Sequence, residues 1–171
     1  MALRQSVSEA DHIQGNLEAP VELVEYGDYE CPHCGRAYPI LKELQKQLGT
    51  SLKFIFRNFP LSKIHPHAKS AAIAAEAAAF QGKYWEMHDI LFENQKRLTS
   101  LAIIEYAQAL ELDIPKFEQD ISNPDLAEKV DAQFYSGMRS GVNATPTFFI
   151  NGEKYEVAPG DLQVFIEANF L

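Results

Sequence analysis

The chain has 171 residues, of which 46% are hydrophobic and 23% are charged, an ordinary composition for a globular domain. This length is enough to bury one hydrophobic core in a single domain. The formal net charge of −9 argues against nucleic acids and anionic membrane surfaces as partners, because both attract basic patches. Two cysteines are too few for a disulfide scaffold, so they form either one redox pair or half of a metal site.

The sequence shows no sign of a leader or of membrane insertion. Residues 1–16 hold no apolar run of signal-peptide length, and no later run reaches the roughly 18 apolar residues that cross a bilayer. As written, the chain is therefore predicted to be soluble and cytoplasmic, without stable membrane insertion. A mature form that had lost its leader and gained a methionine would look the same and would be periplasmic. We expect residues 1–16 to form a flexible, loosely attached polar segment.

The first predicted elements form a β-α-β unit. Residues 21–26 are an apolar strand that is covered on both faces. Apolar residues at helical spacing follow as far as Leu48, where Gly49 marks the end of a helix. Residues 52–57 are rich in aromatic and β-branched side chains and predict a second strand. A helix of about 15 residues between two strands makes them parallel neighbours with a right-handed crossover.

The middle of the chain, residues 62–140, changes to an alanine-rich composition with repeated helix boundaries and predicts a helical domain. Asp113 caps a short turn, and Asn123 followed by Pro124 starts the last helix of this block. One face of that last helix is predicted to carry Leu126, Val130, Phe134 and Met138. The predicted helices of the block cover residues 68–81, 83–95, 101–110 and 124–140.

The β pattern returns near the end of the chain. Residues 147–150 and 153–155 flank Asn151-Gly152, the strongest short signal for a hairpin turn. An amphipathic helix with apolar residues from Leu162 to Phe170 closes the sequence. The order is thus β-α-β, a helical block, then β-β-α.

Both cysteines lie in the sequence Cys31-Pro32-His33-Cys34, at the predicted junction between the first strand and its helix. A helix N-terminus and nearby cations lower a thiol pKa, so Cys31 is the candidate nucleophile and His33 can pair with its thiolate. Cys34 lies one turn further on and is the candidate resolving thiol. Two ordinary core cysteines are the alternative, as is a zinc site completed by His65 and His67.

This order of elements resembles the thioredoxin fold with a helical domain inserted between its halves, as in the DsbA-like thiol–disulfide oxidoreductases. The resemblance covers about residues 17–171 and assigns 17–61 and 141–171 to a thioredoxin-like domain, with 62–140 as the inserted domain. Three local matches support it. They are the Pro32-His33 pair between the cysteines, Glu25 six residues before Cys31, and Gly141-Val-Asn-Ala-Thr-Pro-Thr147 ahead of the hairpin.

The resemblance implies that Glu25 is a buried carboxylate beneath the active site. Burial would raise its pKa and allow it to exchange a proton with Cys34. A solvated glutamate at an edge is the alternative. Glu22 is a weaker candidate, because it lies three residues earlier and so points to the opposite face of the strand.

The resemblance also implies a cis peptide bond between Thr145 and Pro146, packed against the cysteines, which would let Thr145 bind an extended substrate. An ordinary trans proline at a strand edge is the alternative. Thr145 departs from the valine of DsbA, and polar residues at this position also occur in disulfide isomerases. Asp28 and Glu30 are a second departure, and their charge should disfavour the Cys31 thiolate only slightly if both are exposed.

The sequence predicts an enzyme that exchanges disulfides with protein substrates and needs no organic cofactor or metal. Its recycling partner would be the thioredoxin or glutathione system or a DsbB-like membrane protein. The alternatives are a non-catalytic redox-sensing or metal-holding module, and a glutathione-dependent isomerase of the kappa-transferase type, against which Cys34 argues. The remaining histidines are interpreted as surface or capping residues: His12, His65, His67 and His88.

Overall fold

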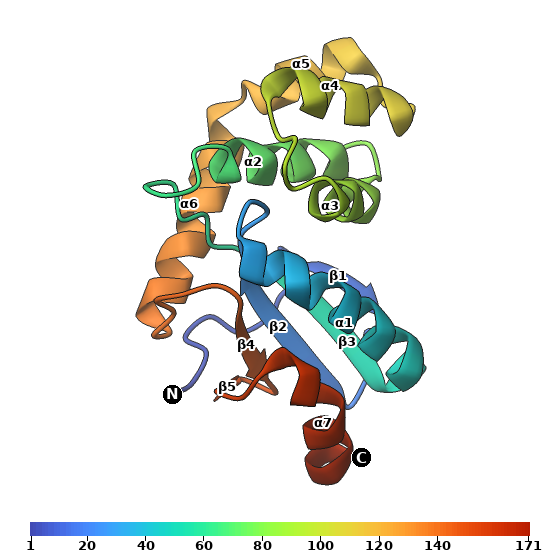
Figure 1. The fold of residues 1–171 in the computed structure, drawn as a ribbon, viewed down its shortest axis with the longest axis vertical. Coiled ribbons are helices and arrows are strands. Elements are labelled where there is room, and N and C mark those ends of the chain that lie inside the picture. The colour runs from blue at the N-terminus through green and yellow to red at the C-terminus, as the bar shows by residue number, and fades with distance from the viewer.

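A five-stranded mixed sheet forms one lobe of the computed structural model, which describes residues 1–171 (Figure 1). The strand order is β1-β3-β2-β4-β5, and only β2 and β3 are parallel to each other. Both predicted strands of the β-α-β unit and both strands of the hairpin are present. The strands are β1 His12–Gly15, β2 Val21–Gly27, β3 Leu52–Asn58, β4 Thr147–Ile150 and β5 Glu153–Tyr155.

Helices α2 to α6 lie between β3 and β4 in the chain, and we call residues 62–140 the helical lobe (Figure 1). The region around Asp113 forms a complete helix rather than a short turn, and the Asp113 side chain accepts a hydrogen bond from the Lys116 N–H at 3.0 Å. The seven helices are α1 Pro32–Leu48, α2 Ala68–Ala79, α3 Tyr84–Glu93, α4 Ser100–Ala109, α5 Ile114–Ile121, α6 Pro124–Arg139 and α7 Leu162–Phe170. None of them combines the length and the hydrophobicity that crossing a bilayer requires.

The predicted hairpin turn is confirmed by its backbone. Asn151 and Gly152 both have positive φ angles, 48° and 83°, as a tight turn between antiparallel strands requires. Asn151 also ties the hairpin to β2, because its side chain accepts a hydrogen bond from the Glu22 N–H at 2.8 Å. The hairpin therefore places β4 beside β2, next to the first half of the fold.

The two faces of the sheet are covered by different parts of the chain. Side chains alternate along β2, so Leu23 and Glu25 share the face covered by α1 and α7 (Figure 1). Val24 and Tyr26 share the opposite face, which the N-terminal residues and α6 cover. Met138 on α6 is 53% exposed, so it does not belong to the packed face that the sequence predicted.

The expectation of a loosely attached segment over residues 1–16 is wrong. Strand β1 pairs antiparallel with β3, and Ala2 bridges to Glu153 at the other edge of the sheet. The buried Arg57 guanidinium holds the segment between these points. It donates to both carboxylate oxygens of Asp11, at 2.8 and 2.9 Å, and to the backbone carbonyls of Gln5 and Ser6. A buried charge needs such partners, and the N-terminal segment supplies them.

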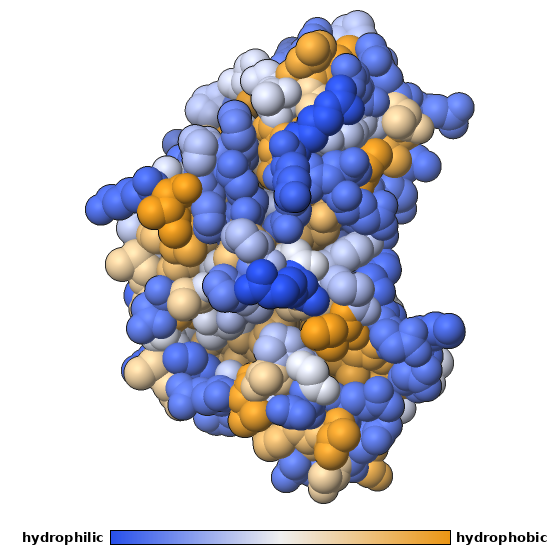
Figure 2. Space-filling view, in the orientation of Figure 1, coloured by the Kyte–Doolittle hydropathy of each residue, from blue (hydrophilic) through white to orange (hydrophobic).

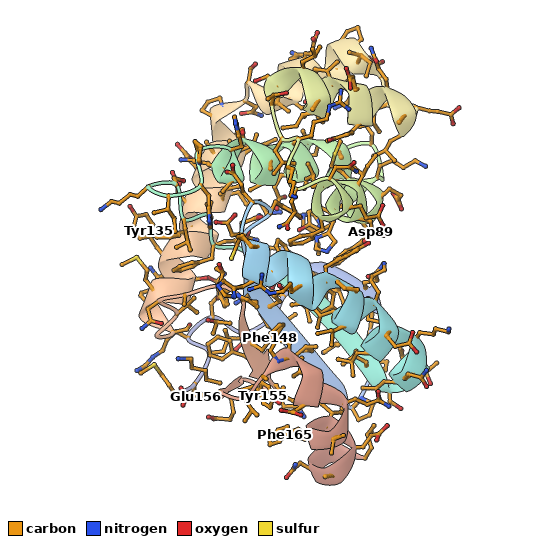
Figure 3. The ribbon with its side chains drawn as sticks, viewed as in Figure 1. Asp89, Tyr135, Phe148, Tyr155, Glu156 and Phe165 are labelled. Carbon is orange, nitrogen blue, oxygen red and sulfur yellow. The ribbon has the colours of Figure 1, made fainter.

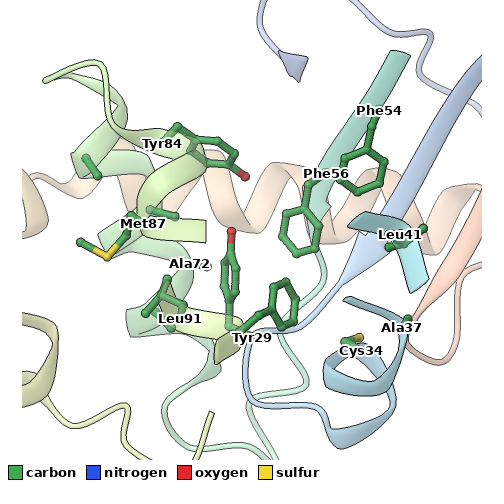
Figure 4. Close-up of a cluster of buried hydrophobic side chains, with 14 of the residues drawn as sticks. Tyr29, Cys34, Ala37, Leu41, Phe54, Phe56, Ala72, Tyr84, Met87 and Leu91 are labelled. Atoms are coloured by element: carbon green, nitrogen blue, oxygen red, sulfur yellow. The ribbon is translucent and has the colours of Figure 1, made fainter. Parts of the chain in front are cut away.

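One continuous hydrophobic cluster of 36 buried residues joins the sheet lobe to the helical lobe. In Figure 4, Tyr29 lies near Tyr84 and Leu91 from α3 on one side and near Phe56 from β3 on the other, and Cys34 belongs to the same cluster. The two lobes thus share a core, and the cysteines belong to it.

Candidate active site

Cys31 is the N-cap residue of α1, and Pro32 occupies the first helical position. Its backbone is extended, with φ −71° and ψ 122°, and no side chain caps the helix. The free N–H groups of the first helical turn therefore lie next to the Cys31 sulfur. The Cys31 N–H donates to the Asp28 carbonyl at 3.1 Å, and the Gly35 N–H donates to the Cys31 carbonyl at 3.0 Å.

The pKa of Cys31 is lowered to about 5. The largest cause is a hydrogen bond from the Cys34 thiol, and Thr145 and the backbone N–H groups of Cys34 and His33 add to it, while burial opposes the shift. Cys31 is thus a thiolate at neutral pH. Both cysteines are free in the structure.

Cys34 has the opposite environment. It is fully buried, and burial raises the pKa of its thiol well above the usual value, with further contributions from Cys31 and Glu25. The two thiols, one helical turn apart, are therefore poised for different roles. One is ionised and the other holds its proton.

Glu25 lies beneath this pair, and the structure buries it to 1% exposure. Its neighbours across the strands on the same face are Phe56 on β3 and Phe148 on β4. Burial among these rings raises its pKa from 4.5 to about 8, and the negative charge of Cys31 adds to the shift. One carboxyl oxygen has no hydrogen-bond partner. Glu22, on the opposite face, is partly exposed and pairs with Lys53 at 3.1 Å.

The Thr145–Pro146 peptide bond is cis, as the resemblance implied. The loop lies against the cysteines, because the Cys31 sulfur is 3.6 Å from the Thr145 carbonyl oxygen, to which it donates a hydrogen bond when it is protonated. Thr145 is buried, and its hydroxyl oxygen is one of four buried side-chain polar atoms that lack a hydrogen-bond partner. The structure thus brings together Cys31, Cys34, Glu25, Thr145 and Pro146 at the junction of α1 with the sheet.

An open groove of about 730 Å³ runs from this loop along β4 and β5. Figure 3 shows Phe148, Tyr155 and Glu156, which line it, on the sheet lobe, and Figure 2 shows that apolar patches interrupt a mainly polar surface on both lobes. Arg36 and Lys154 also line the groove. Its apolar wall consists of Ala37, Ile40, Pro146, Phe148, Tyr155 and Val157.

His33 lies at the end of this groove with its side chain exposed. Its imidazole Nδ1 accepts a hydrogen bond from Arg36 Nη2 at 2.6 Å. The effect of His33 on the Cys31 pKa comes from its backbone N–H, not from the ring expected to pair with the thiolate. Pro32, on the exposed side of the helix start, leaves the first turn without one N–H donor.

Asp28 is not the exposed acid that the sequence analysis assumed, because it is 1% exposed. Its carboxylate accepts hydrogen bonds from the N–H groups of Glu30 and Leu61 and from His65 Nδ1, all within 2.9 Å. His65 is therefore a partner of the active-site loop rather than a surface residue. These contacts join segments that are far apart in the sequence, so no local pattern indicated them.

Gln95 is another residue that the sequence analysis missed. Its side-chain amide donates to the carbonyls of Tyr29 and Cys31 at 2.9 and 2.8 Å and so connects the helical lobe to the loop that bears the thiols. A Cβ on Gly35 would lie 1.9 Å from Gln95 Oε1, so any larger residue at position 35 would displace the Gln95 amide from this position. The sequence signal that could have indicated this contact was Gly35, which directly follows Cys34.

His88 and His12 are also not surface residues. Burial lowers the pKa of His88 to about 3, and its Nδ1 accepts a hydrogen bond from the Tyr29 hydroxyl at 2.9 Å. His12 stacks on Tyr84 and donates to Glu76 at 2.8 Å. The structure brings no three histidine, cysteine or acidic side chains into an arrangement that could hold a metal ion.

Comparison with known proteins gives two groups of relatives. A family model described as thioredoxin matches residues 7–168. The chain is 43% identical over 145 residues to the Na(+)/H(+) antiporter NhaA 3 of Salinispora tropica, which covers 85% of this chain but 22% of the antiporter. The match to NhaA 1 of Mycobacterium sp. (strain KMS) is 44% identical over 166 residues, and it covers 94% of this chain and 26% of that antiporter. The chain thus spans about a quarter of the length of these relatives.

Solved structures agree on the fold. A thioredoxin-like oxidoreductase from Silicibacter pomeroyi is 25% identical, with a TM-score of 0.81 over 94% of this chain and 92% of the other. BdbD of Bacillus subtilis superimposes with a TM-score of 0.79 at 24% identity over 92% and 90% of the two chains. The thiol-disulfide exchange protein α-DsbA2 of Wolbachia pipientis gives 0.82 at 24% identity over 94% and 86%. The chain therefore belongs to the thioredoxin family, and its fold is that of the DsbA-like thiol–disulfide oxidoreductases, with helices inserted between the halves of a thioredoxin fold.

Proposed function

We propose that this protein is a thiol–disulfide oxidoreductase that exchanges disulfides with protein substrates through Cys31 and Cys34. The opposite pKa shifts of the two thiols support this most strongly. Cys31, with a pKa of about 5, is a thiolate that attacks readily and leaves readily, whereas the raised pKa of Cys34 keeps its proton until it is needed.

In the reducing direction, the Cys31 thiolate attacks a client disulfide, and the client's first sulfur leaves as a thiolate. The ionised fraction of Glu25, present because its pKa of about 8 lies about one unit above neutral pH, takes the proton of Cys34, and the Cys34 thiolate attacks the Cys31 sulfur of the mixed disulfide. The client's second sulfur leaves as a thiolate, the client has gained two electrons, and Cys31 and Cys34 are joined by a disulfide.

In the oxidising direction the same steps run backwards. A client thiolate attacks Cys31 in the disulfide, and Cys34 leaves as a thiolate that takes a proton from Glu25. With a pKa of about 8, Glu25 still holds that proton at neutral pH. A second client thiolate attacks the client sulfur bound to Cys31, and Cys31 leaves as the stabilised thiolate.

The groove beside the cis-proline loop is the place for the client. When Cys31 is in a mixed disulfide its thiol no longer donates to the Thr145 carbonyl, so that carbonyl can pair with an extended client backbone. Apolar side chains of the client would contact Ile40, Phe148 and Tyr155.

Insulin reduction by dithiothreitol, with matched single variants, tests the proposal. Cys31→Ser should abolish acceleration of insulin precipitation, and Cys34→Ser should accumulate mixed disulfides through Cys31 that dissolve on adding reductant. A Cys31→Ser protein with unchanged activity would contradict the catalytic role. Stoichiometric zinc in the purified protein that is lost in either variant would instead support the metal-holding module.

The direction of exchange depends on the reduction potential and on the recycling partner, the thioredoxin or glutathione system or a DsbB-like membrane protein. The Cys31 pKa of about 5 lies between those of the nucleophilic thiols of thioredoxin, about 7, and DsbA, about 3.5. A stabilised thiolate makes a couple more oxidising, so we expect a potential between about −270 and −120 mV. Equilibration with glutathione buffers measures it, and a value as low as that of thioredoxin would refute this expectation.

The antiporter relatives suggest a second candidate role, as a redox module that acts beside a membrane transporter of the NhaA type. The identity of 43% to a segment covering 22% of one such antiporter favours it. Cys34→Ser protein incubated with membranes that contain an antiporter of this type provides the test. A mixed disulfide with the antiporter would support the role, and adducts with other proteins alone would contradict it.

A further inference from the structure

The loop that leads into Cys31 carries two acids, Asp28 and Glu30, that the proposed exchange chemistry does not use. Asp28 is the more buried of the two, with an exposed fraction of 1%. One of its carboxylate oxygens accepts from the Glu30 N–H at 2.8 Å, within the same loop. The other accepts from the Leu61 N–H at 2.9 Å and from His65 Nδ1 at 2.8 Å, and both of these donors belong to the loop between β3 and α2.

Glu30 makes a second connection between the same two loops. Its carboxylate accepts a hydrogen bond from the His67 N–H at 2.6 Å. His67 is the N-cap residue of α2, where a negative charge is also favoured by the helix dipole. Both acids therefore accept hydrogen bonds from the β3–α2 loop, and neither faces the Cys31 thiolate as a free charge.

The backbone of Asp28 in turn contacts both thiol residues. Its carbonyl accepts from the Cys31 N–H at 3.1 Å, which fixes the start of α1. Its N–H acts to lower the pKa of Cys34, against the larger effect of burial. A displacement of Asp28 would therefore move the backbone groups that hold both cysteines.

We propose that Asp28 and His65 form a positioning pair that anchors the Cys31 loop to the β3–α2 loop and thereby keeps the thiol pair in its reactive arrangement. The inference rests on the proposed function, since it concerns the same two thiols. His65 donates a hydrogen bond to the buried Asp28 carboxylate and holds it in place, while 16% of the His65 side chain remains exposed to solvent.

Three variants at two histidines of one loop test the pair. His65→Ala removes this hydrogen bond and leaves the Asp28 carboxylate with only its two backbone donors, from Glu30 and Leu61. His65→Asn restores a donor near the position of Nδ1. His67→Ala is the matched control, because the only hydrogen bond from His67 to the active-site loop comes from its backbone N–H.

We measure the Cys31 titration by thiolate absorbance, the equilibrium with glutathione, and thermal unfolding for each protein. His65→Ala should raise the Cys31 pKa by roughly 0.5 to 1 unit, since a loosened helix start and a nearby carboxylate with one donor fewer both disfavour the thiolate. The disulfide form should gain roughly three- to tenfold in the glutathione equilibrium. His65→Asn should recover most of both changes, and His67→Ala should match the wild type.

A His65→Ala protein with the wild-type titration and the wild-type equilibrium would overturn the proposal. So would a His65→Asn protein as impaired as His65→Ala, because the hydrogen bond would then not be what positions the loop. If His65→Ala does not fold, His65→Asn and His67→Ala are compared with the wild type. The proposal is then overturned if His65→Asn shifts the Cys31 pKa or the glutathione equilibrium as much as we expect of His65→Ala, or if His67→Ala shifts either of them. Wild-type protein that fails to reduce insulin would refute the proposed function, whereas the thiolate titration would still report on Asp28 and His65.

Discussion

Two regions of the molecule bury a glutamate almost completely, and they treat it in opposite ways. Glu25, under the thiols, has a carboxyl oxygen without a partner, and its pKa is raised to about 8. Glu76, on α2 at the junction of the lobes, accepts from His12 and Lys129 at 2.8 Å and from Asn58 at 3.3 Å. Its pKa is lowered although burial opposes this, because the partners outweigh it.

This difference in partners means that the Glu25 carboxyl can exchange a proton near neutral pH, whereas the Glu76 carboxylate stays ionised. A buried carboxylate with cationic partners stays ionised and fixes the elements that supply them, here β1, α2 and α6. A buried carboxyl without partners costs stability once it ionises, and a protein tolerates this where the proton has a use. We therefore assign Glu25 to chemistry and Glu76 to the joining of the lobes.

Glu25→Gln should produce the largest change. The folded-state pKa of about 8 lies above the value of 4.5 for the unfolded chain, so the folded state holds this proton more tightly. The free energy of unfolding of the wild type should therefore fall as pH rises from about 4.5 to about 8, by on the order of 4 kcal/mol. The variant should lack this fall and should slow exchange roughly 100-fold.

Urea unfolding between pH 5 and pH 9, together with insulin reduction, measures both effects of Glu25→Gln. Glu22→Gln is the matched control, because Glu22 lies on the other face of β2 and pairs with Lys53 near the surface. Parallel stability curves for wild type and Glu25→Gln would show that the two buried glutamates do not differ as described.

Glu76→Ala should come next in size and should act on stability alone. Removing the carboxylate leaves His12 and Lys129 without their common partner, and breaking such a pair costs about 3 kcal/mol. Because the His12 and Lys129 side chains both reach solvent, with exposed fractions of 18% and 33%, we expect no larger loss. Urea unfolding at pH 7 measures it. A variant with slowed exchange but wild-type stability would reverse the assignment of the two glutamates.

Thr145→Val should give the smallest change and concerns the second orphaned polar atom at the site. The Thr145 hydroxyl has no partner in the dithiol form but favours the Cys31 thiolate. Its removal should raise the Cys31 pKa by roughly half a unit and leave the free energy of unfolding unchanged or higher by about 1 kcal/mol. Thiolate absorbance against pH is the measurement, and a lowered pKa would contradict the role of the hydroxyl.

The sequence was enough for the elements whose signals are local. The strand before Cys31, the helix ending at Leu48, and the hairpin at Asn151-Gly152 are each specified by residues within one element. The place of Cys31 at the start of a helix also follows from a local pattern, whereas the buried Glu25 and the cis bond after Thr145 were implied by the resemblance to the DsbA-like family. Once β2 and β4 are neighbours, Glu25 faces Phe148, so its burial follows from the alternation of side chains.

Contacts between distant segments were beyond such patterns. Asp28 and His65 are 37 positions apart, and Gln95 lies 64 positions from Cys31, so neither connection leaves a trace in local periodicity. Strand β1 was missed for the same reason, because a four-residue strand has little pattern of its own and is formed by its pairing with β3. Pairing between distant segments decides whether a polar side chain is buried. From composition alone, polar residues such as Asp28 and His65 were expected to be exposed.

The path of the N-terminal segment has a consequence for association between molecules. Exposed sheet edges recruit strands from other chains and promote aggregation. Here the edge of β3 is paired by β1, and the three-residue β5 is paired in part by Ala2, with the Leu3 N–H donating to the Gly152 carbonyl at 2.8 Å. One continuous segment thus makes one edge of the sheet a four-residue strand and covers part of the other, so little free backbone remains on which another chain could polymerise.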